Sequence, residues 1–109
     1  MKKLLALTVV LGLAAAIVAR ADEAKDNWTN MCAKCHGDDG KGQTKMGQRL
    51  KARDYTDAKV QDSFKDDDAF KAIKEGLKDA DGKTQMKPYD TLSDDQIKAL
   101  VAYLRTFKH

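Results

Sequence analysis

The sequence predicts one all-α domain of three to five helices. Apolar residues recur at helical spacing in several separate stretches, whereas no five-residue stretch alternates cleanly between apolar and polar residues as a half-buried strand does. A capping box at Ser93–Gln96 and glycines directly after two of the apolar stripes supply start and stop signals for helices. These observations favour helices packed on one another.

The first 21 residues have the pattern of a secretory signal peptide. Lys2 and Lys3 give a charged start, an apolar run of 16 residues follows, and the small residues around Arg20 predict cleavage after Ala21. A bilayer span needs about 20 apolar residues, so a retained anchor is the less favoured alternative. We expect a periplasmic or otherwise exported protein that has no stable membrane insertion after cleavage.

Residues 22–109 are expected to form the single domain, and their charges balance. The precursor has a formal net charge of +3, but three basic residues precede the domain while all 17 acidic residues lie within it. A domain of zero formal charge has no basic excess for nucleic acid, so we expect no nucleic-acid partner. We also expect a monomer.

The first helix is expected to run through one apolar face and to end at Gly37, and a turn-rich loop with Gly40 and Gly42 follows. That face carries Ala24, Trp28, Met31, Cys32 and Cys35. A short second helix is expected from Thr56 as its N-cap residue, with Tyr55 and Val60 as a hydrophobic staple.

The third helix is expected from about Asp66 to Glu75, because three aspartates suit a helix N-terminus and Gly76 is a stop signal. The last helix begins at the Ser93–Gln96 capping box, with Leu92 and Ile97 at the staple positions. Its stripe should pack against the first helix near Ala24 and Trp28. The stripe consists of Ile97, Leu100, Val101, Leu104 and Phe107.

The most specific motif is Cys32-Ala33-Lys34-Cys35-His36, at the end of the first helix. In a helix, residues three apart lie on one face, so Cys32 and Cys35 can each form a thioether with a vinyl group of one haem. His36 comes next along the chain and can reach the iron as the proximal axial ligand. The motif therefore predicts one covalently attached haem c. Large apolar side chains are sparse in this domain, so the haem would also supply part of its interior.

Other uses of the two cysteines remain as alternatives. Exported proteins form disulfides, and a Cys-x-x-Cys pair near a βαβ pattern is a dithiol redox site, but no such pattern is present. A zinc site normally takes four Cys or His ligands, and the chain has only two cysteines and two histidines.

Met86 is the candidate for the distal axial ligand of the iron. It lies in a loop stiffened by an Asp-Gly turn and by the single proline, Pro88, and its soft sulfur suits haem iron. Met46 and Met31 are the competing methionines, and an open or His-ligated iron is a further alternative. Met31 is adjacent to the motif, and Met46 lacks the proline-containing frame.

From about Ala24 to Phe107 the chain resembles a small bacterial class I cytochrome c. The likeness lies in Cys32–Gly37, Phe70–Gly76, Met86–Tyr89 and Leu92–Leu104, which resemble the family's motifs in the family's order. The resemblance implies helices wrapped around one haem, crossing first and last helices, and one-electron transfer. Family members often have a proline after the attachment loop, whose carbonyl accepts the proton of the axial histidine Nδ1. This chain has no proline there, and a carbonyl between Gly40 and Met46 is the expected substitute.

These features predict an exported single-haem electron carrier that cycles between Fe(III) and Fe(II) and exchanges electrons with redox protein donors and acceptors. It is not expected to be an enzyme, because an iron with both axial positions filled leaves no position for a substrate. The alternatives are a haem enzyme or gas- or peroxide-reactive domain with a labile sixth ligand, and a dithiol exchange protein.

Overall fold

The Cys-x-x-Cys-His motif lies at the end of a helix that contains a π-helical turn. The computed structural model describes residues 20–109, so nearly all of the predicted signal peptide lies outside the described residues. Residues 20–27 are α-helical, η1 (Trp28–Cys32) is a π-helical turn, and α2 (Ala33–His36) completes the helix. The wider turn appears in the bond from the Ala33 amide to the Trp28 carbonyl, five residues earlier. We call residues 20–36 the motif helix. It ends at Gly37, as predicted, where φ is 80°.

The loop after the motif contains a helix that was not expected, α3 (Lys45–Leu50). Thr44 is its N-cap residue, and its hydroxyl accepts a hydrogen bond from the Gly47 amide at 2.9 Å. The same hydroxyl lies 2.9 Å from the carbonyl oxygen of Cys35, to which it can donate. The start of α3 is therefore fastened to the motif.

The second predicted helix is present as α4 (Ala58–Asp62), but it begins one residue later than expected. Its N-cap residue is Asp57, whose side chain accepts from the Lys59 amide at 2.9 Å. Thr56 was the wrong choice, because its hydroxyl donates to the carboxylate of Asp54 at 2.6 Å instead of capping the helix.

The third predicted helix has the expected bounds, α5 (Asp66–Glu75). At its start the Lys65 amide donates to the Asp68 carboxylate at 3.0 Å, and Gly76 ends it with a φ of 78°.

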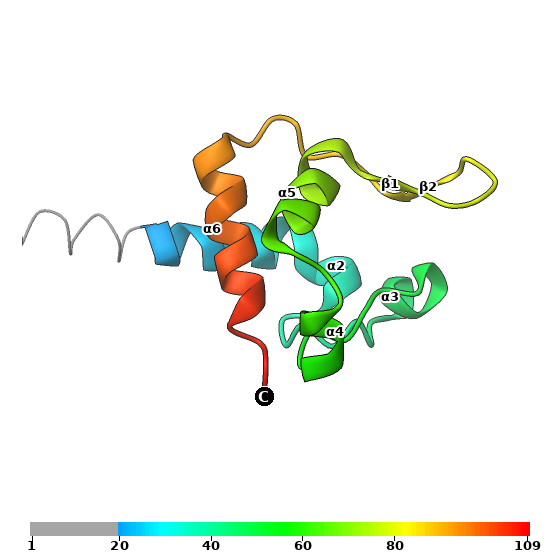
Figure 1. Ribbon diagram of the computed structural model, residues 1–109, viewed down its shortest axis with the longest axis horizontal. Helices are drawn as coiled ribbons and strands as arrows, with labels where there is room; N and C mark the ends of the chain where they lie inside the picture. Colours follow the sequence, from blue (N-terminus) through cyan, green and yellow to red (C-terminus); the bar gives the residue numbers. More distant parts are fainter. Residues whose placement is uncertain (1–19) are drawn as a thin grey trace, which may run out of the picture.

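A short antiparallel hairpin follows α5, made of β1 (Leu77–Lys78) and β2 (Thr84–Met86), with Leu77 opposite Met86. The hairpin projects from the helices in Figure 1. It was not predicted, but two such short strands leave the all-α class unchanged.

The last helix, α6 (Asp94–Arg105), begins at the predicted capping box. The Gln96 amide donates to the Ser93 hydroxyl at 3.1 Å, and the Ser93 amide donates to the Gln96 side chain at 2.8 Å. In Figure 1, α6 crosses the motif helix, and the Gln96 side chain meets Glu23 there at 2.6 Å. The predicted packing is confirmed, since Ala24 and Trp28 are buried and the ring centre of Trp28 lies 5.8 Å from that of Tyr103 on α6.

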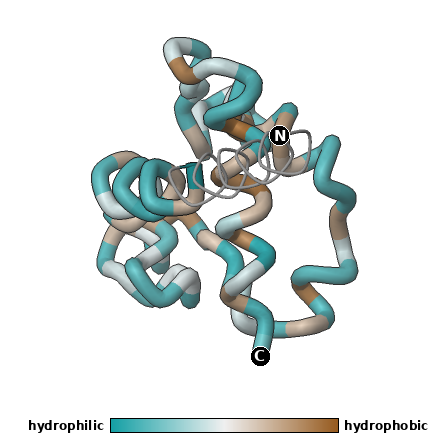
Figure 2. The backbone as a smooth tube through the Cα atoms, turned by 90° about the vertical axis from the view of Figure 1, so that its left-hand side faces the viewer, coloured by the Kyte–Doolittle hydropathy of each residue, from teal (hydrophilic) through white to brown (hydrophobic). Residues whose placement is uncertain are grey.

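The core is small and lies where these helices meet. Most of the chain is hydrophilic in Figure 2, with apolar residues spaced along it. The buried cluster comes from the motif helix, α5 and α6, and it consists of Trp28, Cys32, Ile73, Ile97, Leu100, Val101 and Leu104. Among residues 20–109, no helix has the length and apolar character needed to cross a membrane.

Arg105, at the end of α6, joins α6 to α4 and α5. Its Nη1 donates to the side-chain oxygen of Gln61 on α4 at 2.9 Å, and its Nε lies 2.8 Å from the carboxylate of Asp66 on α5. Its Nη2 donates to the carbonyl of Phe64, between the two helices, at 2.9 Å. The guanidinium also lies 4.2 Å from the centre of the Phe64 ring. Gln61, buried in α4, donates to the Leu104 carbonyl at 3.0 Å. These contacts hold α4 against the end of α6 opposite the capping box.

Candidate functional site

The two cysteines of the motif are free thiols in different surroundings. Cys32, the last residue of η1, is buried, and Cys35 in α2 is partly exposed. Burial, and secondarily negative charge on Cys35, raises the pKa of Cys32 to about 11. The raised pKa keeps the Cys32 thiol protonated at neutral pH, and a protonated thiol is not the nucleophile of disulfide exchange.

His36 is directed into an aromatic cluster at the end of the motif helix. The centre of its ring lies 5.6 Å from that of Trp28 and 5.3 Å from that of Tyr55. Burial lowers the pKa of His36, so the ring is held in the neutral form that can ligate a metal. Its Nδ1 atom is buried and has no hydrogen-bond partner among the described residues. The carbonyl expected between Gly40 and Met46 is therefore not found bonded to it here.

Hydrogen bonds to main-chain carbonyls fix the backbone around the motif. The indole Nε1 of Trp28 donates to the Gly37 carbonyl at 2.8 Å, so a side chain from η1 holds the residue that follows His36. The Gly42 amide donates to the His36 carbonyl at 2.8 Å, and Thr44 reaches the Cys35 carbonyl. This role of Trp28 was not predicted from the sequence, although a buried indole N–H needs an acceptor.

Met86 is the last residue of β2, partly buried, and packs against the core cluster that contains Cys32. The chain from Met86 to Pro88 passes closely over Gly76: a β-carbon there would lie 2.6 Å from the Met86 carbonyl oxygen and 2.9 Å from the Pro88 nitrogen. The glycine that ends α5 thus lets the Met86 segment lie against the body of the protein.

Tyr89 connects this segment to the motif helix. Its hydroxyl donates to the carbonyl of Met31 at 2.7 Å, across 58 positions of the sequence. Burial raises the pKa of Tyr89, and negative charge on Cys32 and Cys35 raises it further. This role of Tyr89 was not predicted from the sequence.

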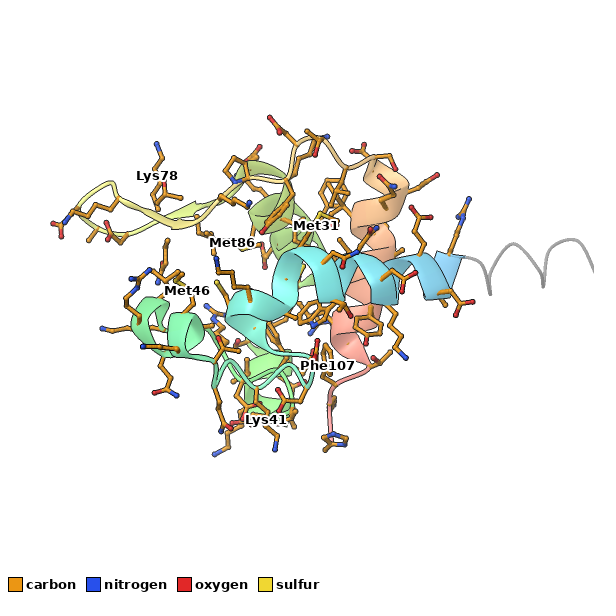
Figure 3. The ribbon with its side chains drawn as sticks, turned by 180° about the vertical axis from the view of Figure 1, so that it is seen from behind. Met31, Lys41, Met46, Lys78, Met86 and Phe107 are labelled. Atoms are coloured by element: carbon orange, nitrogen blue, oxygen red, sulfur yellow. The ribbon has the colours of Figure 1, made fainter. Side chains whose placement is uncertain are left out.

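The two competing methionines are Met46 and Met31, and Figure 3 draws Met86 between them. The sulfur of Met46, on α3, lies 2.8 Å from Nη2 of Arg49 at the protein surface. Met31 belongs to η1 and packs against the core.

The donor set fits a covalently held haem. Two free thiols three residues apart, a neutral imidazole on the residue that follows them, and a thioether against the same core are the groups that such a cofactor needs. Residues 20–109 contain no cluster of three or more His, Cys, Asp or Glu side chains placed to hold a metal ion. Fold and site define the class of small helical haem proteins.

The chain belongs to the cytochrome c family, whose model matches residues 21–108. It is also similar to the solved structure of the KustC0563 c-type cytochrome, with 32% sequence identity and a TM-score of 0.68 over 79% of this chain and 98% of that chain. A comparison with curated proteins gives no match. The predicted family, the all-α fold and the covalently bound haem c with its iron are thereby confirmed. A haem c protein of this family carries electrons.

Proposed function

We propose that the protein is an exported single-haem electron carrier in which Cys32 and Cys35 form the thioethers and His36 and Met86 are the axial ligands. The observation that carries this proposal is the state of the motif: free thiols three residues apart and a buried, neutral His36 on the same helical turn. Redox protein donors and acceptors are the partners.

Each residue has a defined task in this proposal. When bound, the haem iron supplies the one-electron Fe(III)/Fe(II) chemistry. His36 is held neutral by burial, and the bonds to Gly37 and to the His36 carbonyl fix the backbone from which its ring extends. Met86 offers a soft sulfur, which favours the reduced state relative to more strongly donating ligands. With both axial positions taken by the chain, no position remains for a substrate, so we propose a carrier and not an enzyme.

The surroundings of the three methionines favour Met86. The Met46 sulfur already lies against the Arg49 guanidinium at the surface. Met31 lies within η1, directly before Cys32, and so belongs to the same helix as the proximal ligand. Met86 comes from the opposite end of the domain sequence, packs against the core and is held in place by Gly76 and Tyr89.

A basic surface on α3 and its flanks suits an acidic partner. Residues 41–53 contain five basic residues and no acidic residue, and all five basic side chains are exposed. They are Lys41, Lys45, Arg49, Lys51 and Arg53. We propose that a redox partner with an acidic face docks here, so electron exchange should slow as salt screens the charges over about 8–10 Å.

The boundary between the N-terminal segment and the region matched by the family supports export. The family match begins at residue 21, next to the predicted cleavage after Ala21. The segment before it begins with two lysines and continues as an apolar run, which is the pattern of a signal peptide. We propose that this segment is removed and that the domain works in the periplasm or otherwise outside the cytoplasm.

Optical spectra of Met86→Ala and Met46→Ala holoproteins test the ligand set. Met86→Ala should remove the sulfur-to-iron charge-transfer band at the red end of the oxidised spectrum and lower the reduction potential, because a soft ligand is lost. Met46→Ala, the matched control, should change neither. Loss of the band in Met46→Ala alone would transfer the role to Met46. A high-spin oxidised spectrum of the unaltered protein would favour the rival reading of a haem enzyme with a labile sixth ligand.

A further inference from the structure

The Met86 segment is held to the rest of the protein by contacts of two main kinds, besides an exposed hydrogen bond from the Gln85 side chain to the Leu50 carbonyl of α3 at 3.2 Å. The first kind fixes it to the end of α5: Met86 is paired with Leu77, the Tyr89 amide donates to the Ile73 carbonyl at 2.8 Å, and the chain lies over Gly76. These are main-chain contacts that any side chain at position 89 would preserve.

The second kind fixes the segment to the motif helix, and it depends on one side chain. Among the hydrogen bonds of residues 84–92 in the described part of the chain, only that from the Tyr89 hydroxyl to the Met31 carbonyl, at 2.7 Å, reaches the motif helix. Met31 directly precedes Cys32, and Tyr89 comes three residues after Met86. The bond therefore joins the segment that carries Met86 to the helix that carries the haem-attachment motif.

The ring of Tyr89 is itself held in place. It packs against the core, and the Lys87 ammonium lies 5.2 Å from the ring centre. The acceptor is fixed too, because the Met31 carbonyl belongs to η1. A hydroxyl held between two ordered elements can resist displacement of the segment that carries it.

We propose that Tyr89 is a positioning residue for Met86, and that its hydroxyl keeps the Met86 sulfur at the iron when an outside ligand competes for that position. This inference rests on the proposed role of Met86 as the distal ligand. The hydrogen bond to Met31 has to break, or to stretch, when the Met86 segment swings away from the motif helix. Tyr89 thus opposes opening of the distal side without touching the iron.

Imidazole binding to the oxidised holoprotein measures this opening. Tyr89→Phe keeps the ring and removes the hydroxyl, and it should raise the association constant of imidazole about tenfold, which corresponds to about 1.4 kcal/mol and to the loss of one hydrogen bond. Tyr103→Phe is the matched control. It makes the same chemical change on α6, where no hydrogen bond of the hydroxyl is found within residues 20–109, and it should leave imidazole binding unchanged.

A double variant separates positioning from general loosening of the protein. Once Met86→Ala has removed the thioether, adding Tyr89→Phe should change imidazole affinity by less than about twofold, because no sulfur is left to be held. A tenfold effect of Tyr89→Phe that persists in the Met86→Ala background would overturn the inference in favour of a merely structural role. Wild-type imidazole binding by Tyr89→Phe would overturn it as well.

The same set of proteins distinguishes failure of this inference from failure of the proposed ligand. If Met86→Ala loses the charge-transfer band while Tyr89→Phe behaves as wild type, the proposed function stands and the role of Tyr89 is wrong. If Met86→Ala keeps the band, Met86 is not the ligand, and both are wrong.

Discussion

Trp28 should contribute more to stability than any other single side chain near the motif. It is 3% exposed, its indole donates to the Gly37 carbonyl at 2.8 Å, and its ring lies 5.0 Å from that of Phe107. Trp28→Phe keeps an aromatic ring but loses the hydrogen bond and part of the packing. The Gly37 carbonyl still accepts from the Gly40 amide at 3.2 Å, so the lost bond costs only about 1 kcal/mol. Reduced packing adds roughly 1–2 kcal/mol.

A total of about 2–3 kcal/mol should lower the melting temperature of a domain this size by roughly 10–20 °C. Thermal unfolding of the oxidised holoprotein, followed by far-ultraviolet circular dichroism, measures the shift. Tyr103→Phe serves as control and should stay within about 0.5 kcal/mol of wild type. A shift below about 4 °C in Trp28→Phe would refute the reasoning, because it would show that the bond to Gly37 and the ring contacts contribute no more than a surface residue does.

Three further predictions concern the frame of the site. Gly47→Ala places a β-carbon against the Cys35 carbonyl and should destabilise the holoprotein by about 2–3 kcal/mol in denaturant unfolding. Gly82→Ala, with open space but a positive φ, should cost only about 1–2 kcal/mol, and equal effects of the two changes would count against the close approach. Arg105→Gln should lower the free energy of unfolding by about 1–2 kcal/mol through loss of its bonds to Gln61 on α4 and Asp66 on α5, and an unchanged denaturation midpoint would contradict this. The haem-free variant Cys32→Ser/Cys35→Ser, made without residues 1–21, should show only fragmentary helix and no cooperative melting. Its core is too small to offset about 1–2 kcal/mol of backbone entropy per residue. A sharp melting transition with high helicity would disprove this prediction.

The helices that the sequence predicted are those whose signals are local. The bounds of α5 follow from three aspartates and a terminal glycine, and α6 follows from a capping box and a long apolar stripe. In contrast, α3 has no apolar stripe and contains Gly47, a residue that disfavours helices. It is held by Thr44, whose hydroxyl contacts the end of the motif helix, and such a contact exists only in the folded chain.

Other differences arise where neighbouring residues compete or where a pattern is too short. Thr56 and Asp57 are both good capping residues, and the choice depends on the bond from Thr56 to Asp54. The hairpin pairs only two residues with three, below the length at which alternation can be recognised. Trp28 and Cys32 are four positions apart, which is also the spacing of one face of an ordinary α-helix, and both are buried. The spacing of apolar residues therefore does not reveal the π-helical turn.

More of the candidate site than of the surrounding fold could be predicted from the sequence, because the three residues of the haem-attachment motif lie close together in the chain. Cys32, Cys35 and His36 form a contiguous motif, and their helix placement is confirmed. The residues that hold this motif, Trp28 and Tyr89, act through side-chain bonds across 9 and 58 positions. Bonds over such distances depend on the packing of the whole chain, which a local pattern does not contain.

Covalent attachment of the haem through Cys32 and Cys35 is the central claim of this account. Its direct test is the intact mass of the exported protein after heating in denaturant, which removes every haem held by coordination alone. We predict a chain that begins at Asp22 and carries the mass of one haem. A Cys32→Ser/Cys35→Ser chain from the same host should carry none. An unaltered protein that releases its haem on denaturation, or that never acquired one, would contradict the account.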